Sequence, residues 1–140
     1  SRLMSNIREE KGYTYGIGSY NVTMPQAAHW MIATDVNTEA TDATITECIK
    51  EIRRLQEEPV PEEELSLVKS YFNGELLREL DGVFSQSDAL KHKLNYGLDN
   101  TFYLRAIDKI RTCTAEDIMR LAQKYLNVDD MYIVTAGKDA

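Results

Sequence analysis

Two different periods of apolar residues occupy separate parts of this chain, and their separation decides the class of fold. Between residues 13 and 36, apolar and small side chains alternate with a period of two, which is typical of strands. Between residues 38 and 125, apolar residues recur every three or four positions, which is typical of helices. We therefore predict an α+β fold in which a run of helices covers one face of a mainly antiparallel sheet.

The predicted sheet consists of a hairpin and one strand at the end of the chain. A short helix that begins near Leu3 is expected to end at Gly12 in a left-handed conformation. Residues 13–23 and 28–36 are the two predicted hairpin strands, and the β-branched run MYIVTAG at residues 131–137 is the predicted last strand. Three strands make a thin sheet with open edges, so we expect the chain to be truncated at its N-terminus.

Five helices are predicted between the hairpin and the last strand. Pro59 and Gly97 are expected to end the first and the third, and Pro61 to begin the second. Thr114 and Asp117 are expected to form a capping box for the fifth. The predicted inward faces are, in chain order, Ile45, Cys48, Ile49, Ile52 and Leu55; Leu65, Val68, Phe72, Leu76 and Leu80; Leu90 and Leu94; Tyr103, Ala106, Ile107 and Ile110; Ile118, Leu121, Ala122 and Tyr125.

Size and charge limit the classes of partner. A chain of 140 residues that is 43% hydrophobic suits a single domain, residues 1–140. Its net charge of -7 disfavours nucleic acid and anionic membranes as partners. No apolar run approaches the ~20 residues of a membrane helix, and no targeting segment is visible, so we expect a soluble chain of unknown localisation. An open sheet edge makes a homodimer possible.

The residues that usually carry catalysis do not form a complete site. Neither His29 nor His92 has a second His or a Glu three or four positions later, as a zinc pair on a helix requires. Cys48 and Cys113 lack the Cys-x-x-Cys spacing and are interpreted as buried free thiols. The residues therefore predict no metal or cofactor in this chain.

The segment SRLMSNIREEKGYTYGIGSY, Ser1 to Tyr20, resembles a known motif. It is similar to the start of the second, non-zinc-binding domain in the pitrilysin/insulinase family of zinc metallopeptidases, the inverted zincins. The order of the hairpin, the long helix from about residue 38, the helix start at Pro61 to Lys69 and the closing strand is also similar. The resemblance implies that residues 1–140 are most of the second domain of a two-domain peptidase half, facing a homologous zinc-binding domain across a chamber.

The resemblance also implies roles for two residues. In this family the first domain binds zinc through His-x-x-Glu-His and a downstream Glu, and the second contributes an Arg and, seven residues later, a Tyr. Arg8 and Tyr15 match those positions. Arg8 is expected to bind main-chain carbonyls of a peptide substrate, and Tyr15 to hydrogen-bond near the scissile bond. Because the sequence contains no His-x-x-Glu-His, zinc is expected in the partner domain, on the same or a separate chain, and this chain alone is expected to be inactive.

Three alternatives remain open at this point. Arg8 can instead pair with Glu9, Glu10 or another carboxylate, with Tyr15 serving only in packing. The chain can be a catalytically inactive scaffold or processing subunit of the same family. It can also be an unrelated α+β binding module, in which Arg8 and Tyr15 have no part.

Overall fold

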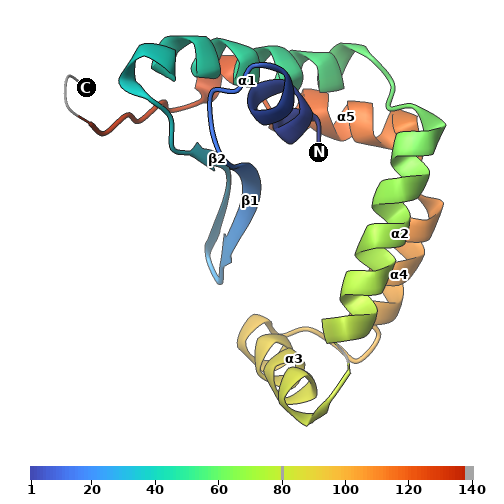
Figure 1. Ribbon diagram of the computed structural model, residues 1–140. Coiled ribbons are helices and arrows are strands. Elements are labelled where there is room, and N and C mark those ends of the chain that lie inside the picture. Colours follow the sequence, from blue (N-terminus) through green and yellow to red (C-terminus); the bar gives the residue numbers. More distant parts are fainter. Residues whose placement is uncertain (80, 138–140) are drawn as a thin grey trace. The chain divides into compact units, whose positions relative to one another are not determined.

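A computed structural model describes residues 1–79 and 81–137 of the chain (Figure 1). The chain forms two compact units, of which one combines Ser1–Glu58 with Met119–Ala140 and the other is Pro59–Ile118. Strands and helices are segregated along the sequence, so the predicted α+β class is confirmed. That the whole chain behaves as a single domain stays a prediction.

The first unit begins with a short π-helix, η1, followed by a hairpin and a long helix. Its elements are η1 Met4–Glu10, β1 Ile17–Met24, β2 Ala27–Thr34, the 3-10 turn η2 Thr38–Ala40, α1 Thr41–Glu57, most of α5 Ala115–Tyr125, and the 3-10 turn η3 Val128–Asp130. The predicted end of the first helix is confirmed, because Gly12 has a φ of 67°. The amide of Tyr13 donates to the carbonyl of Ile7 over 3.0 Å, a bond that closes the helix behind this glycine.

The antiparallel hairpin is confirmed. Its register pairs Ile17 with Thr34 at the open end and Met24 with Ala27 beside the turn. Burial alternates along β2 as expected from its period, with Trp30 half-buried. The predicted start of the first strand at residue 13 is wrong, because β1 begins at Ile17. The four residues before it, 13–16, form an irregular turn.

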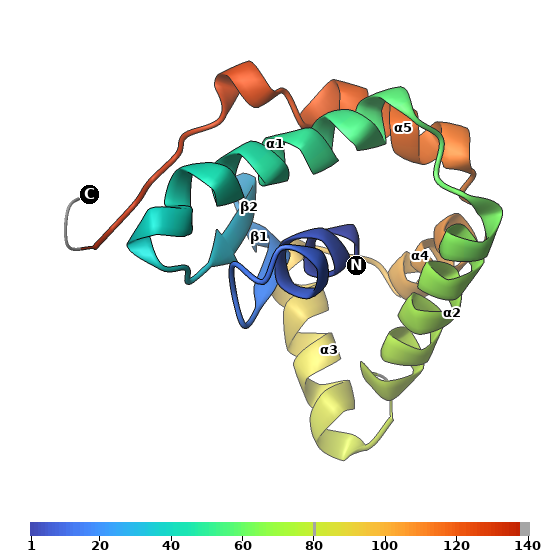
Figure 2. The ribbon, with the colours of Figure 1, turned by 45° about the horizontal axis from the view of Figure 1, so that its top comes forward.

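The core of the first unit lies where η1 contacts both β1 and α1. Ile7 is completely buried there, and Ile52 of α1 is 3% exposed, so the predicted inward face of α1 is confirmed at its centre. The side chain of Gln56 donates to the carbonyl of Leu126 over 2.7 Å, and Gln123 donates to the carbonyl of Gln56 over 2.7 Å. These bonds hold the end of α5 alongside α1, as both views show (Figures 1 and 2).

The predicted last strand is wrong. Residues 131–137 have an extended course after η3 but pair with no strand among the described residues. Tyr132 is 97% exposed and Val134 is 88% exposed. β-branched residues favour an extended backbone, but a strand also requires a neighbouring edge with which to exchange hydrogen bonds. Within the described part of the chain, this segment pairs with neither edge of the β1–β2 hairpin.

The second unit consists of helices. α2 Glu62–Glu79 contacts both α3 Val83–Tyr96 and α4 Phe102–Thr112. The predicted breaks at Pro59 and Gly97 are confirmed, and Gly97 has a φ of 61°. The predicted capping box before α5 is also confirmed.

In that box the amide of Asp117 donates to the Thr114 hydroxyl over 3.1 Å, and the amide of Thr114 donates to the Asp117 carboxylate over 3.3 Å.

In the second unit, the predicted inward face of α2 is confirmed only in part, and that of α3 is wrong. Leu65 of α2 is buried, but Phe72 is 50% exposed, and Leu94 of α3 is 74% exposed. Leu80 lies outside the described residues. A helical period identifies an apolar face, but it does not say whether the same chain supplies a surface to cover that face.

Candidate functional site

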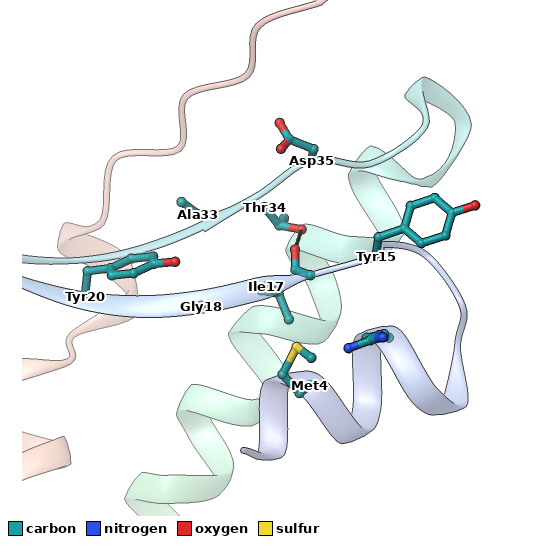
Figure 3. A pocket seen from close by; sticks show the side chains of 10 residues that line it. Met4, Tyr15, Ile17, Gly18, Tyr20, Ala33, Thr34 and Asp35 are labelled. Carbon is teal, nitrogen blue, oxygen red and sulfur yellow. Dashed lines mark hydrogen bonds between the residues drawn. The ribbon is translucent and has the colours of Figure 1, made fainter. Parts of the chain in front are cut away.

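A groove of about 630 Å³ lies between η1 and the open end of the hairpin (Figure 3). Its lining residues come from three segments: Met4 and Arg8 from η1; Tyr15, Gly16, Ile17, Gly18 and Tyr20 from the turn and β1; Ala33, Thr34 and Asp35 from the end of β2. Arg8 and Tyr15 therefore line the same groove, although their assigned roles stay a prediction.

Arg8 reaches the groove because its neighbours in η1 are anchored. Ile7 is completely buried and Asn6 is 8% exposed, so the adjacent Arg8 side chain stays on the exposed side of the short helix. Among the described residues, no carboxylate forms an ion pair with Arg8, and Glu10 pairs with Lys11 instead. The guanidinium thus keeps its hydrogen-bond donors for another molecule.

The side chain of Tyr15, like that of Arg8, is exposed to solvent. It is 98% exposed, and its ring extends beyond the end of the hairpin, away from Tyr20 at the other end of the groove (Figure 3). Within the described part of the chain, its hydroxyl makes no hydrogen bond. An exposed ring of this kind does not serve in packing, and its hydroxyl can donate to a bound molecule.

The surface of the groove beside Tyr20 depends on a glycine. A Cβ atom added to Gly18 would lie 2.6 Å from the Tyr20 hydroxyl oxygen, so the phenol occupies the space that a side chain at Gly18 would need. Gly18 and Tyr20 are two residues apart and share one face of β1. The absence of a side chain at Gly18 therefore allows the Tyr20 ring to lie flat along the hairpin.

The turn that carries Tyr15 is fixed by hydroxyl groups. The Thr14 hydroxyl donates to the carbonyl of Asp35 over 2.7 Å and accepts from the amide of Gly16 over 3.1 Å. The Thr34 hydroxyl lies 2.9 Å from both the Thr14 hydroxyl and the carbonyl of Gly16. These bonds explain why residues 13–16 form a turn instead of extending β1. Sequence reasoning missed Thr14, because its bond to the carbonyl of Asp35 spans 21 residues.

A second polar cluster holds η1 against α1. The side-chain amide of Asn6 donates to Glu47 over 2.9 Å and to Glu51 over 2.8 Å. Glu51 is 7% exposed. The hydrogen bond from Asn6 lowers the pKa of Glu47 below its ordinary value of 4.5; partial burial opposes this, and Lys50 adds to it. Sequence reasoning missed Asn6, because its partners lie 41 and 45 residues away.

We expect Asn6→Asp to destabilise the chain at pH 7 by about 2 kcal/mol, because a buried donor is replaced by a third carboxylate. In the unchanged protein, the lowered pKa of Glu47 stabilises the fold above pH 4.5, and this contribution is lost as the pH falls through the lowered value. In the Asn6→Asp variant, lower pH should instead reduce the loss in free energy of unfolding, because a protonated carboxyl can again donate a hydrogen bond. Urea denaturation at pH 7 and pH 4.5, followed by Trp30 fluorescence, measures both values.

Asn6→Ala is the control for this prediction, since it removes the donor without adding a charge. Its deficit should shrink less between pH 7 and pH 4.5 than that of Asn6→Asp, because it loses only the hydrogen bond to Glu47 and Glu51 and adds no third carboxylate. A deficit of Asn6→Asp that is equal at the two pH values would contradict the repulsion between carboxylates.

The described residues contain no group of three or more His, Cys, Asp or Glu side chains that could hold a metal ion. Cys48 and Cys113 are free, as predicted, but half-buried. Burial, with a smaller effect from the charge of Glu47, raises the pKa of the Cys48 thiol to about 11. Cys48 therefore stays protonated and unreactive at neutral pH. Within the described ranges, no helix has the length and apolar character needed to cross a membrane.

Residues 1–72 match the family described as the peptidase M16 inactive domain. Curated protein sequences give no significant match.

Several solved structures have a similar fold. A peptidase M16 inactive domain from Pseudomonas fluorescens is 24% identical with a TM-score of 0.82; the alignment covers 92% of this chain and 31% of that one. The periplasmic protease PqqL from Escherichia coli is 21% identical with a TM-score of 0.71, covering 89% and 14%. A chain of complex III2 from Candida albicans is 18% identical with a TM-score of 0.74, covering 88% and 29%. This chain thus spans less than a third of each of these chains.

Proposed function

The chain belongs to the peptidase M16 inactive-domain family, and from this membership we propose that it is the non-catalytic, substrate-binding domain of a zinc metalloendopeptidase. In this proposal the complete enzyme hydrolyses peptides in an enclosed chamber. A homologous zinc-binding domain, on the same or a separate chain, faces the groove and supplies the metal, the attacking water and the general base. This domain supplies Arg8 and Tyr15.

The observation that carries the proposal is that Arg8 and Tyr15 line one open groove while neither side chain is engaged by another described residue. The guanidinium presents several N–H donors in a planar fork, a geometry that suits the carbonyl oxygens of an extended peptide. The Tyr15 hydroxyl can donate one hydrogen bond. A donor placed near the scissile bond stabilises the negative charge that develops on the carbonyl oxygen during attack.

Zinc content and activity of the complete protein test whether one domain binds zinc and the other binds the substrate. We expect the complete protein to hold one zinc ion per zinc-binding domain and to cleave a fluorogenic peptide, and a chelator to abolish the cleavage. Arg8→Ala and Tyr15→Phe should leave the zinc content unchanged, because neither residue is proposed to contact the metal. A complete protein without zinc and without peptidase activity would contradict the proposal.

A second candidate function is that of an inactive scaffold or processing subunit of the same family. The likeness in fold to a chain of complex III2 from Candida albicans favours considering it. In that case the groove residues would have no effect on any hydrolysis, and the zinc assay would be negative. A homodimer through the open edges of the hairpin stays a prediction, which sedimentation of the complete protein tests.

A further inference from the structure

We propose that Thr14 is a positioning residue for Tyr15, holding the phenol in place through the backbone. The inference rests on the proposed function of Tyr15 and extends it to a residue that does not line the groove. The side chain of Tyr15 is 98% exposed. A side chain with almost no packing contacts is not oriented by its neighbours, so its position is set by the backbone that carries it.

The backbone on both sides of Tyr15 is held by a single oxygen atom. Thr14 Oγ1 accepts from the amide of Gly16 over 3.1 Å, so it bridges across Tyr15 from the preceding residue to the following one. The same oxygen donates to the carbonyl of Asp35 over 2.7 Å, which lies 21 residues later, just after β2. The half-buried Thr14 hydroxyl thus fastens the Tyr15 turn to the opposite strand end.

The bonding capacity of a hydroxyl fits this set of partners. A hydroxyl has one proton and two acceptor lone pairs. With its proton directed to the carbonyl of Asp35 and not to that of Gly16, which lies 2.9 Å away, Thr14 Oγ1 can accept both from the Gly16 amide and from the Thr34 hydroxyl, also 2.9 Å away. A valine has the same shape and can make none of these bonds, whereas a serine keeps all of them.

Two groups in the turn need the Thr14 hydroxyl for different reasons. The amide of Gly16 precedes β1, so it has no ladder partner of its own in the hairpin register, which begins at Ile17 and Thr34. The carbonyl of Asp35 lies one residue beyond the end of β2. Without the hydroxyl, both groups would turn to water, and the segment that carries Tyr15 would sample other conformations.

A double-mutant cycle in the complete peptidase tests this inference. Thr14→Val is expected to lower kcat about tenfold with little change in KM, because a displaced Tyr15 hydroxyl loses its contact in the transition state. Thr14→Ser should stay within about twofold of the unchanged enzyme, since it keeps the hydroxyl. In a Tyr15→Phe background, adding Thr14→Val should cause no further loss, because the hydroxyl that Thr14 positions is already absent.

The outcomes of the cycle separate this inference from the proposed function. If Tyr15→Phe has full activity, both are overturned. If Tyr15→Phe is impaired but Thr14→Val multiplies that loss, Thr14 acts on the fold in general and only this inference is overturned. If Thr14→Val does not fold, the same cycle is run with Thr14→Ala, which also removes the hydroxyl. Full activity of Thr14→Ala, or a loss that multiplies with that of Tyr15→Phe, overturns the inference.

Discussion

Replacing Tyr15 by Phe in the complete peptidase is expected to lower kcat about 100-fold, the typical loss when one donor to a developing oxyanion is removed. KM should change little, because the bond is proposed to form mainly in the transition state. The substitution removes one oxygen atom from a side chain that is 98% exposed, so the fold has no reason to change. Steady-state hydrolysis of an internally quenched fluorogenic peptide measures both constants.

Tyr132→Phe is the matched control for this prediction. Tyr132 is 97% exposed, almost as much as Tyr15, but it does not line the groove. The control should therefore keep full activity. Equal activity of Tyr15→Phe and Tyr132→Phe would remove Tyr15 from the proposed mechanism.

Replacing Arg8 by Ala is expected to lower kcat/KM about 100-fold, since hydrogen bonds from a charged group are worth about 1.5–3 kcal/mol. Unlike the loss at Tyr15, much of this loss should be in KM, because a guanidinium that binds substrate carbonyls acts in the ground state as well. Arg8→Lys should recover only part of the activity. Its ammonium keeps the charge but lacks the planar fork of donors. The same fluorogenic assay measures all three enzymes.

Arg53→Ala is the corresponding control. Arg53 is exposed on α1 and does not line the groove. If Arg53→Ala and Arg8→Ala lowered kcat/KM equally, the effect would be one of overall charge and the specific role of Arg8 would be wrong. A loss of zinc in Arg8→Ala would also contradict the account, because Arg8 is proposed to bind substrate only.

Local signals in the sequence were sufficient for much of the fold. Gly12 ends η1 because its φ of 67° is costly for any residue with a Cβ atom. Thr114 and Asp117 cap α5 through bonds between residues three positions apart. The hairpin follows from alternation in two nearby segments. In each case the residues that decide the structure are close together in the chain.

Other features could not be predicted because they depend on residues that are distant in the chain or on surfaces that the described residues do not supply. The extended segment 131–137 has strand propensity, but it pairs with neither edge of the described hairpin. Leu90 and Leu94 share a helical face that the described residues leave largely exposed, at 53% and 74%. Apolar pattern and propensity describe what a segment is suited to, whereas its burial depends on which surfaces are present.

Some residues of the candidate site were identified from the sequence and others were not. Arg8 and Tyr15 were identified by resemblance, and the turn at Gly12 is what allows a helix end and a strand start to share one groove. Asn6 and Thr14, which hold the two elements in place, were missed. Their decisive hydrogen bonds reach residues 21 to 45 positions away, and no local pattern indicates such pairs.

Photo-crosslinking tests most directly whether the groove holds a peptide. The complete peptidase would carry a photoreactive benzoylphenylalanine in place of Tyr15, with the general base of its zinc motif inactivated so that substrate stays bound. We expect illumination to crosslink the peptide to residue 15. Mass spectrometry should locate the crosslinked residues of the peptide near its scissile bond. The same probe placed at Tyr132 should give no adduct. Equal labelling at both positions, or none at residue 15 while the peptide is bound, would contradict the account.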